Sequence, residues 1–453
     1  MHQLYPFQQE AVDQLCKRGN TLLADEMGLG KTVQALSFIN ADRSIKRVLI
    51  ICPKNVVPTW VNERREWLSP RPGLMVRITN YEQADEDCLL LFRGHEIDLL
   101  ILDESQYVMN AAAKRSQRVA LLAMHSKRLL LISGTPLQSR PIELWNQLCL
   151  LEPGKWNNEV LMPQLFQIRY GKLMIKDMRT VPPNWVESTV AAHHAFGLLY
   201  CGAKRKSIGR GRFGRKYAWD YSGASREAEL AARIEHLIIR RTKAQVFGQM
   251  SRKTRQVVLF DGRWDDDDLI PELADENFED CISRLRGDSV AFEKWSQRRH
   301  EQGIAKVPIV IEHVKNVLRE ERQVIVFAHH RDVIQELRNG LQPFGLVSIT
   351  GETDVEERNQ AVQLFQDRKV RAFIGSIKAA GVGITLTAAS TVIFAEIDPV
   401  LAAMEQAEDR ADRIGQTMPV TAQYLLFDGT LDARICKILM RKKRIIDRIM
   451  VNR

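Results

Sequence analysis

Short apolar runs separated by helical patterns recur along two stretches of the chain. The first stretch carries such runs at Thr21–Ala24, Arg47–Cys52, Leu99–Leu102 and Leu129–Ile132. The second carries them at Val324–Ala328, Val347–Ile349, Ala372–Ile374, Val392–Ala395 and Gln423–Leu426. Strands buried on both faces of a parallel sheet are continuously apolar, and strands that alternate with helices indicate β-α-β units. The pattern therefore predicts an α/β fold of two lobes, each a mostly parallel sheet flanked by helices.

The sequence between these stretches has a different texture and predicts helical and irregular insertions. Residues from about 154 to 223 are rich in glycine, aromatic and basic residues, and Arg226–Arg241 has a helical pattern. Gly262–Asp268 contains four consecutive aspartates, which is typical of a solvated loop, and helical sequence follows to about Arg299. We expect a first lobe at 1–245 with a basic insertion at about 155–222, a helical and acidic linker insertion at 246–305, and a second lobe at 306–453 that ends in a basic bracing helix.

Composition narrows the class of protein only slightly. The chain has 453 residues and a formal net charge of +9, which suits two or three domains and weakly favours polyanionic partners. Its seven cysteines are scattered and include no C-x-x-C pair, so we expect reduced thiols rather than a zinc ribbon or a redox dithiol. The longest apolar runs are about five residues, far below the roughly 20 that span a bilayer. We therefore expect no membrane partner.

The strongest chemical signal is Asp25–Thr32, which follows an apolar run and opens a helical pattern. Gly28 and Gly30 would let backbone amides approach phosphates, Lys31 would place its charge against the β- and γ-phosphates, and Thr32 would offer its hydroxyl to magnesium. The first residue of this segment is aspartate where the usual phosphate-loop pattern has glycine. The alternative is a glycine-rich helix start that binds no ligand.

Two carboxylates follow the apolar run that ends at Leu102. We predict that Asp103 binds magnesium and that Glu104 polarises the attacking water. An Asp-Glu pair after a strand is common by chance, but its position downstream of a phosphate loop favours the functional interpretation.

A third segment, Gln406–Gln416, contains two arginines three residues apart. On a helix Arg410 and Arg413 would share a face, where two guanidinium groups can clamp the charge that develops on a γ-phosphate. The alternative is a helix that carries only internal ion pairs.

These blocks resemble motifs of a known family. Asp25–Thr32 is similar to motif I, and Gln406–Gln416 to motif VI, of the Swi/Snf family of superfamily-two DNA translocases. Motif II, at Asp103–Gln106, has Gln106 where the family usually has histidine, and Ile397–Pro399 stands where the family tends to have Trp-x-Pro. The other similar blocks are Leu4–Gln8 (adenine-reading segment), Cys52–Lys54 with Trp60 and Glu63 (motif Ia), Thr79–Glu82 (motif Ib), Ser133–Gln138 (motif III), Arg240–Lys243 (end of the first lobe) and Ser376 with Gly381–Leu386 (motif V).

The resemblance implies two RecA-like lobes with ATP and Mg²⁺ between them. It implies a catalytic set of Lys31, Asp103, Glu104, Arg410 and Arg413, with Thr32 and Asp103 as the metal-binding residues. It also implies nucleotide contacts from Gln8, Gly28, Gly30, Lys31, Thr32, Gly383 and Gln406. The implied DNA contacts in the motifs are Lys54, Thr135, Ser376 and Thr385.

Some blocks point to one branch of the family. His194–Gly197 with Tyr200–Cys201, Ala203–Arg205, Trp219–Gly223 and Phe327–His330 resemble the HepA-related annealing helicases, which rewind DNA and remodel stalled forks. The resemblance implies double-stranded or branched DNA as the partner and action as a monomer. It also implies a minimal bacterial or phage-encoded version that acts in the cytoplasm, or in the nucleus of a eukaryote.

The basic stretch Lys204–Lys216 has two possible readings. Its glycines disfavour a helix. It either grips DNA phosphates and stacks aromatic side chains on a junction, or it is a flexible solvated loop. The predicted DNA contacts here are Lys204, Arg205, Arg210 and Arg212.

Three functions remain open at this point. The first is an ATP-hydrolysing translocase that tracks on duplex DNA and rewinds or remodels branched DNA. The second is a strand-separating DNA or RNA helicase, and the third is a non-enzymatic, nucleotide-gated DNA clamp.

Overall fold

The computed structural model divides the chain into two compact units. The first unit comprises Met1–Asp25, Lys31–Arg240 and Lys443–Arg453, and the second comprises Glu26–Gly30 and Arg241–Lys442. The structure describes residues 3–84, 96–138, 140–156, 166–169, 172–175, 192–211, 214–247, 253–260, 289–321, 323–380 and 384–450.

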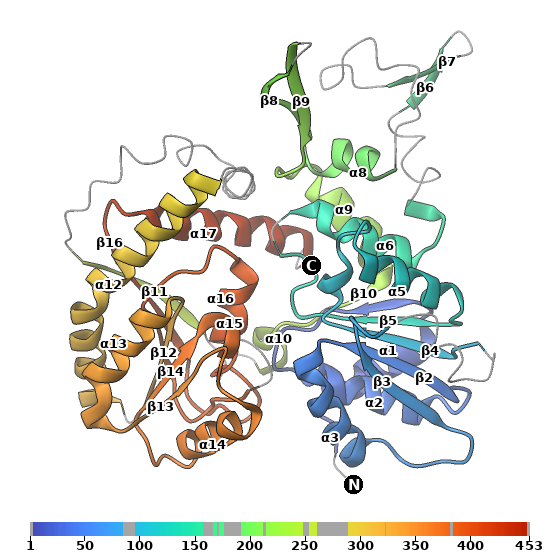
Figure 1. Ribbon diagram of the computed structural model, residues 1–453. Coiled ribbons are helices and arrows are strands. Elements are labelled where there is room, and N and C mark those ends of the chain that lie inside the picture. The colour runs from blue at the N-terminus through green and yellow to red at the C-terminus, as the bar shows by residue number, and fades with distance from the viewer. Residues whose placement is uncertain are drawn as a thin grey trace. The chain divides into compact units, whose positions relative to one another are not determined.

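A six-stranded parallel sheet forms the centre of the first unit, in the order β10-β1-β5-β4-β2-β3. Its strands are β1 (Thr21–Leu23), β2 (Arg47–Cys52), β3 (Met75–Asn80), β4 (Leu99–Asp103), β5 (Leu129–Ile132) and β10 (Ile238–Ile239). Its helices are α1 (Pro6–Lys17), α2 (Lys31–Ala41), α3 (Val57–Trp67), α5 (Lys114–Met124), α6 (Trp145–Leu151), α8 (Ala192–Tyr200) and α9 (Glu227–Ile234). Helices α2 and α3 cover one face of the sheet, and α5 and α6 cover the opposite face (Figure 1).

Burial on both faces explains why β2 is apolar throughout. Val48 and Ile50 pack in one core cluster with α1, α2 and α3, whereas Leu49 and Ile51, which alternate with them, are also fully buried. Alternate side chains of a strand point to opposite faces, so a sheet covered by helices on both sides requires this continuous apolar run.

The second unit repeats the architecture with a parallel sheet in the order β11-β16-β15-β12-β14-β13. Its strands are β11 (Thr254–Phe260), β12 (Val324–Ala328), β13 (Leu346–Ile349), β14 (Ala372–Ser376), β15 (Thr391–Phe394) and β16 (Thr421–Phe427). Its helices are α10 (Lys243–Phe247), α12 (Ser289–Glu320), α13 (Arg331–Leu341), α14 (Val355–Gln366), α15 (Ile377–Ala380), α16 (Leu401–Glu408) and most of α17 (Leu431–Met450). The predicted α/β class with two mostly parallel sheets is confirmed.

Two expectations about the middle of the chain require correction. Arg226–Arg241 is not one helix, because α9 ends at Ile234 and the chain then enters β10. The stretch 246–305 is not only helical and acidic, because it contributes strand β11 to the edge of the second sheet. Much of β11 is exposed, so the sequence shows no continuous apolar run there. The run of four aspartates lies outside the described residues.

The basic stretch forms a β-hairpin rather than a loop. β8 (Lys204–Gly211) pairs antiparallel with β9 (Gly214–Asp220), and Figure 1 shows the hairpin extending beyond α8 and α9. A second short hairpin pairs β6 (Phe166–Arg169) with β7 (Lys172–Ile175). Among the described residues, no helix is both long and apolar enough to cross a bilayer.

Candidate functional site

The phosphate-loop segment connects β1 to α2, as predicted. Gly28 and Gly30 have φ of 83° and 74°, values that side chains disfavour and glycine adopts freely. Lys31 is the first residue of α2, and its Nζ donates to the Asp25 carbonyl oxygen at 2.8 Å. Asp25 is fully buried and its Oδ2 accepts from Gln34 Nε2 at 3.1 Å. This hydrogen bond explains how an aspartate is accommodated where the usual pattern has glycine.

The predicted adenine contact lies at the start of the chain. Gln8 is on α1, is 3% exposed, and its Oε1 accepts from the Tyr5 backbone N at 3.1 Å. The contact fixes the start of α1 and orients the Gln8 amide. Thr32, which is also predicted to contact the nucleotide, is half-buried in the first turn of α2.

Asp103 is the last residue of β4, where the carboxyl ends of β1, β5 and β4 lie side by side in the sheet. Its Oδ2 accepts from Trp60 Nε1 at 2.7 Å, and its Oδ1 accepts from the Glu104 backbone N at 2.9 Å. Burial and the neighbouring Glu104 carboxylate raise the pKa of Asp103 to about 7, against the opposing charge of Lys31. A buried carboxylate whose charge is disfavoured in this way fits a divalent cation, which would compensate that charge.

Glu104 has a left-handed backbone, with φ 51° and ψ 55°. Such a conformation is costly for a residue with a side chain and clusters at functional sites in proteins. Glu104 Oε2 accepts from Gln106 Nε2 at 2.7 Å, and Gln106 Oε1 accepts from Ser133 Oγ at 2.7 Å. The glutamine amide therefore joins motif II to motif III by donating to one and accepting from the other.

A second link joins the same two motifs. Ser105 Oγ donates to Gln147 Oε1 at 2.7 Å, and Gln147 Nε2 donates to the Pro136 carbonyl oxygen at 2.8 Å. Both side chains are fully buried. The segment Glu104–Gln106 after β4 is thus held to the segment after β5 through two separate hydrogen-bonded paths.

The prediction that Arg410 and Arg413 share a helix face was wrong. α16 ends at Glu408, and both arginines lie in the turns that follow. The Arg410 carbonyl oxygen accepts from the Leu386 backbone N at 2.8 Å. In a continuing helix the same oxygen would accept from the backbone N four residues later. Arg410 Nη1 donates to the Ile384 carbonyl at 3.3 Å, and Arg413 Nη1 donates to Thr385 Oγ1 at 3.0 Å.

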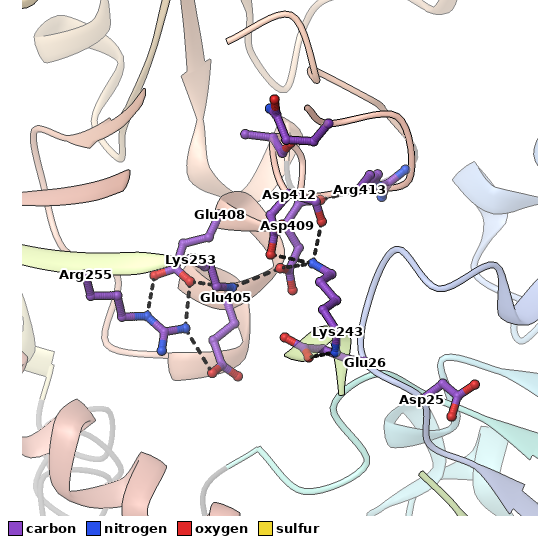
Figure 2. A network of polar contacts seen from close by, with 12 residues as sticks. Asp25, Glu26, Lys243, Lys253, Arg255, Glu405, Glu408, Asp409, Asp412 and Arg413 are labelled. Carbon is purple, nitrogen blue, oxygen red and sulfur yellow. Dashed lines mark hydrogen bonds and ion pairs between the residues drawn. The ribbon is translucent and has the colours of Figure 1, made fainter. Parts of the chain in front are cut away.

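A buried ionic network surrounds these turns (Figure 2). Lys243 Nζ contacts Asp409 Oδ1 at 2.9 Å and Asp412 Oδ2 at 2.7 Å. The Lys243 backbone N also donates to Glu26 Oε2 at 2.7 Å, so a residue of the phosphate-loop segment joins the same network. The carboxylate oxygens of Glu26, Asp409 and Asp412 lie within 4.8 Å of one another, and the Lys243 ammonium pairs with the two aspartates.

Basic residues from the edge of the second sheet complete the network. Lys253 Nζ contacts Glu408 Oε2 at 2.8 Å and Asp409 Oδ1 at 2.9 Å, and Arg255 Nη2 contacts Glu408 Oε2 at 2.6 Å. Although burial alone would raise it, Lys253 and Arg255 hold the pKa of Glu408 at about 2. Although burial alone would raise it, the pKa of Asp409, which precedes Arg410, is also held low by Lys243 and Lys253. The ion pairs of Asp409 and Asp412 fix the turn that carries both arginines.

The remaining predicted residues are placed as follows. Lys54 is exposed in a 3₁₀ turn before α3, and Ser376 is half-buried at the end of β14. Thr135 is 8% exposed, and its hydroxyl has no hydrogen-bond partner among the described residues. Gln406 is half-buried on α16, and Gly383 lies outside the described residues. Their roles toward nucleotide and DNA stay predictions.

The blocks that suggested one branch of the family build the base of the β8–β9 hairpin. His194 Nδ1 and the Tyr221 hydroxyl lie 2.6 Å apart. A Cβ atom at Gly197 would lie 2.3 Å from the Tyr221 ring, and one at Gly223 would lie 2.7 Å from the Cys201 carbonyl oxygen. These positions require glycine because backbone and ring pack directly against them.

The basic residues of the β8–β9 hairpin lie in different environments. Lys206 forms an ion pair with Asp220 at 2.8 Å. The Arg205 guanidinium lies over the Tyr217 ring, 4.4 Å from its centroid, and that ring is 47% exposed. The predicted contact Lys204 is exposed, whereas the side chain of Arg210 and the whole of Arg212 lie outside the described part of the structure.

Two family models match the chain. The SNF2-related domain matches residues 7–76 and 71–261, and the helicase conserved C-terminal domain matches residues 306–415. The chain therefore belongs to the SNF2-related family, in agreement with the resemblance seen in the sequence, and its two sheets are those of the two RecA-like lobes of that family.

The names of similar proteins agree with the annealing-helicase branch of the family. The chain is 30% identical to the SWI/SNF-related matrix-associated actin-dependent regulator of chromatin subfamily A-like protein 1 of Drosophila melanogaster, over 99% of this chain and 56% of that protein. It is 31% identical to the DNA annealing helicase and endonuclease ZRANB3 of Mus musculus, over 98% and 40%. The chain spans about half the length of these relatives. A solved Sulfolobus solfataricus SWI2/SNF2 ATPase core in complex with dsDNA is 22% identical, with a TM-score of 0.40, over 98% of this chain and 92% of that one.

Several residues of the site were not predicted as functional. Trp60 was noted only as part of motif Ia, and Lys243 only as part of the segment that closes the first lobe. Both carry side-chain contacts to predicted catalytic segments. Gln34, Lys253 and Arg255 have no sequence signal of their own, because polar residues on a helix or an edge strand are ordinary.

Proposed function

We propose that the chain is an ATP-dependent motor that hydrolyses ATP when it binds DNA, tracks on duplex DNA, and rewinds or remodels branched DNA. The observation that carries the proposal is the arrangement at the carboxyl edge of the first sheet. There the phosphate-loop segment follows β1, and Ser133 follows β5. Asp103 ends β4, Glu104 follows it, and hydrogen bonds through Gln106 join the segments after β4 and β5. Family membership and relatives named as annealing helicases support the same function.

In the proposed mechanism each residue has one task. Lys31 would bind the phosphates, and Thr32 and Asp103 would hold Mg²⁺, which would neutralise phosphate charge. Glu104 orients the attacking water, and Gln106 limits its side-chain freedom through the hydrogen bond at 2.7 Å. Arg410 and Arg413 stabilise the charge that develops on the transferred phosphoryl group.

A comparison of DNA cofactors tests the proposal. ATP hydrolysis is measured with equal nucleotide concentrations of duplex, single-stranded and forked DNA. We expect duplex and forked DNA to stimulate turnover more than single-stranded DNA, with faster annealing of complementary strands. Greater stimulation by single strands together with duplex separation would favour the strand-separating helicase, and DNA binding without turnover would favour the clamp.

The hairpin gives a second prediction, about DNA affinity. Replacing Lys204, Arg205, Arg210 and Arg212 by glutamine should leave ATP hydrolysis without DNA unchanged and weaken DNA binding. Each lost phosphate contact should lower the slope of log K against log salt by about 0.9 on duplex DNA. Lys206 is left intact because its ion pair with Asp220 belongs to the hairpin structure. Binding is measured by fluorescence anisotropy at several salt concentrations.

A matched variant controls for net charge. Lys17, Arg43, Lys46 and Lys114 are exposed and lie outside the hairpin, and their replacement by glutamine removes the same charge. If both variants lose equal affinity, the hairpin has no special role. A further substitution, Tyr217→Ala, should weaken binding to forked DNA more than to duplex if the exposed ring stacks on bases.

A further inference from the structure

The side chain of Trp60 has an unusual partner for a core tryptophan. It is fully buried, one turn into α3, and its only polar atom donates to the carboxylate of Asp103 at 2.7 Å. The partner is the predicted metal-binding residue at the end of β4, and it belongs to a different element from the helix that carries the tryptophan. A buried indole N–H generally finds an acceptor, but here the acceptor is a carboxylate of the candidate site rather than a backbone carbonyl.

We propose that Trp60 is a positioning residue for the nucleotide site: its indole N–H fixes the rotation of the Asp103 carboxylate and so presets one oxygen toward the metal–nucleotide complex. The proposal rests on the proposed ATPase function. Trp60 itself touches neither metal nor substrate.

The geometry of Asp103 supports this role. A carboxylate turns easily about its last side-chain bond, because that torsion is broad. In this chain both oxygens are engaged by rigid donors, Oδ1 by the Glu104 backbone N at 2.9 Å and Oδ2 by Trp60 Nε1. Each oxygen keeps a further lone pair that can coordinate a cation. The carboxylate plane is therefore fixed before a metal binds, which reduces the ordering cost of binding.

Neighbouring residues hold both the donor, Trp60, and the acceptor, Asp103, in place. Trp60 packs in the core cluster that joins α1, α2 and α3 to the sheet. The Tyr81 hydroxyl donates to the Asp103 backbone carbonyl at 2.8 Å, which anchors the main chain of the same residue. Donors outside the first coordination sphere that orient a metal ligand commonly change metal affinity about 10- to 100-fold when removed.

The competing interpretation is that Trp60 only fills the core. The two interpretations differ for Trp60→Phe, which keeps an aromatic ring in the core and removes the N–H. Affinity for a fluorescent ATP analogue is measured by equilibrium titration, once with excess Mg²⁺ and once with EDTA, so that no turnover is needed. We expect about a 10-fold weaker affinity with Mg²⁺ and an unchanged affinity with EDTA.

Two further variants make the test specific. Trp67→Phe, at the end of the same helix, is the matched control and should leave both affinities unchanged, because Trp67 lies about two turns beyond Trp60 on α3. Trp60→His restores an N–H donor on a smaller ring and should recover part of the Mg²⁺-dependent affinity. Thermal melting reports the folded state of each protein.

The outcomes separate this inference from the proposed function. Equal loss of affinity with Mg²⁺ and with EDTA, or an unchanged Mg²⁺ response with a lower melting temperature, would overturn the positioning role, as would a failure of both Trp60 variants to fold. A wild-type chain that binds Mg²⁺–nucleotide but shows no DNA-stimulated hydrolysis would instead contradict the proposed function, and the Trp60 result would stand.

Discussion

Replacement of Lys31 by alanine is expected to abolish ATP turnover and to leave a folded protein that still binds DNA. Lys31 begins α2 directly after the glycines with positive φ, and its ammonium is held at the Asp25 carbonyl. In such a loop the ammonium supplies the charge that meets the β- and γ-phosphates. Its loss therefore removes both phosphate binding and stabilisation of the transferred group.

The fold should tolerate this change. Lys31 is half-buried and does not belong to the core cluster of the first unit. Its hydrogen bond to the Asp25 backbone carbonyl is worth about 1 kcal/mol. Steady-state hydrolysis, thermal melting and DNA binding are compared with those of Lys17→Ala, an exposed lysine at the end of α1. Turnover near that of the wild type would contradict the assignment of the phosphate loop.

The extent to which sequence predicted the fold depended on burial. All nine predicted strands are present, and all except the edge strand β13 are largely buried, which requires mostly apolar residues along their length. The strands that were not predicted lie at or near sheet edges. β3 alternates exposed and buried residues, β10 has two residues, and β11 is largely exposed. Their place in the sheet comes from backbone pairing, which a single sequence does not display.

The same distinction applies to the site. Lys31, Asp103 and Glu104 could be predicted from the sequence because each belongs to a short polar segment that follows an apolar strand. Contacts such as Trp60 with Asp103, or Lys243 with Asp409, join residues 43 and 166 positions apart. Long-range pairing of this kind has no local pattern, so only the folded structure could reveal it.

The turn that carries the two arginines shows how tertiary contacts override a local pattern. The segment up to Glu408 is helical as predicted, but the carbonyl of Arg410 is bound by Leu386 N from a separate loop. The hairpin is a second case. Its glycines correctly argued against a helix, but they do not reveal the β8–β9 pairing or the close packing of Gly197 against Tyr221 at its base.

Replacement of Arg413 by alanine is expected to lower kcat by about 10³-fold or more, with a much smaller effect on nucleotide affinity. An arginine that stabilises the charge of a transferred phosphoryl group acts in the transition state and is worth this much in related reactions. At 25 °C a 10³-fold change corresponds to about 4 kcal/mol in the activation free energy. The structure supports the assignment, since a Cβ atom at Gly28 of the phosphate-loop segment would lie 3.1 Å from Arg413 Cγ.

The control must separate charge stabilisation from loss of the turn. Arg413→Lys keeps a positive charge but loses the planar fork that can bind two phosphate oxygens, so we expect it to restore only a small part of kcat. Arg338→Ala removes an exposed arginine from α13 in the same unit and should have no effect. The ionic contacts of Lys243 with Asp409 and Asp412 do not involve the Arg413 side chain, so they should keep the turn folded in all three variants. Single-turnover hydrolysis and equilibrium nucleotide binding give the two quantities separately, and an unchanged kcat in Arg413→Ala would exclude this arginine from the reaction.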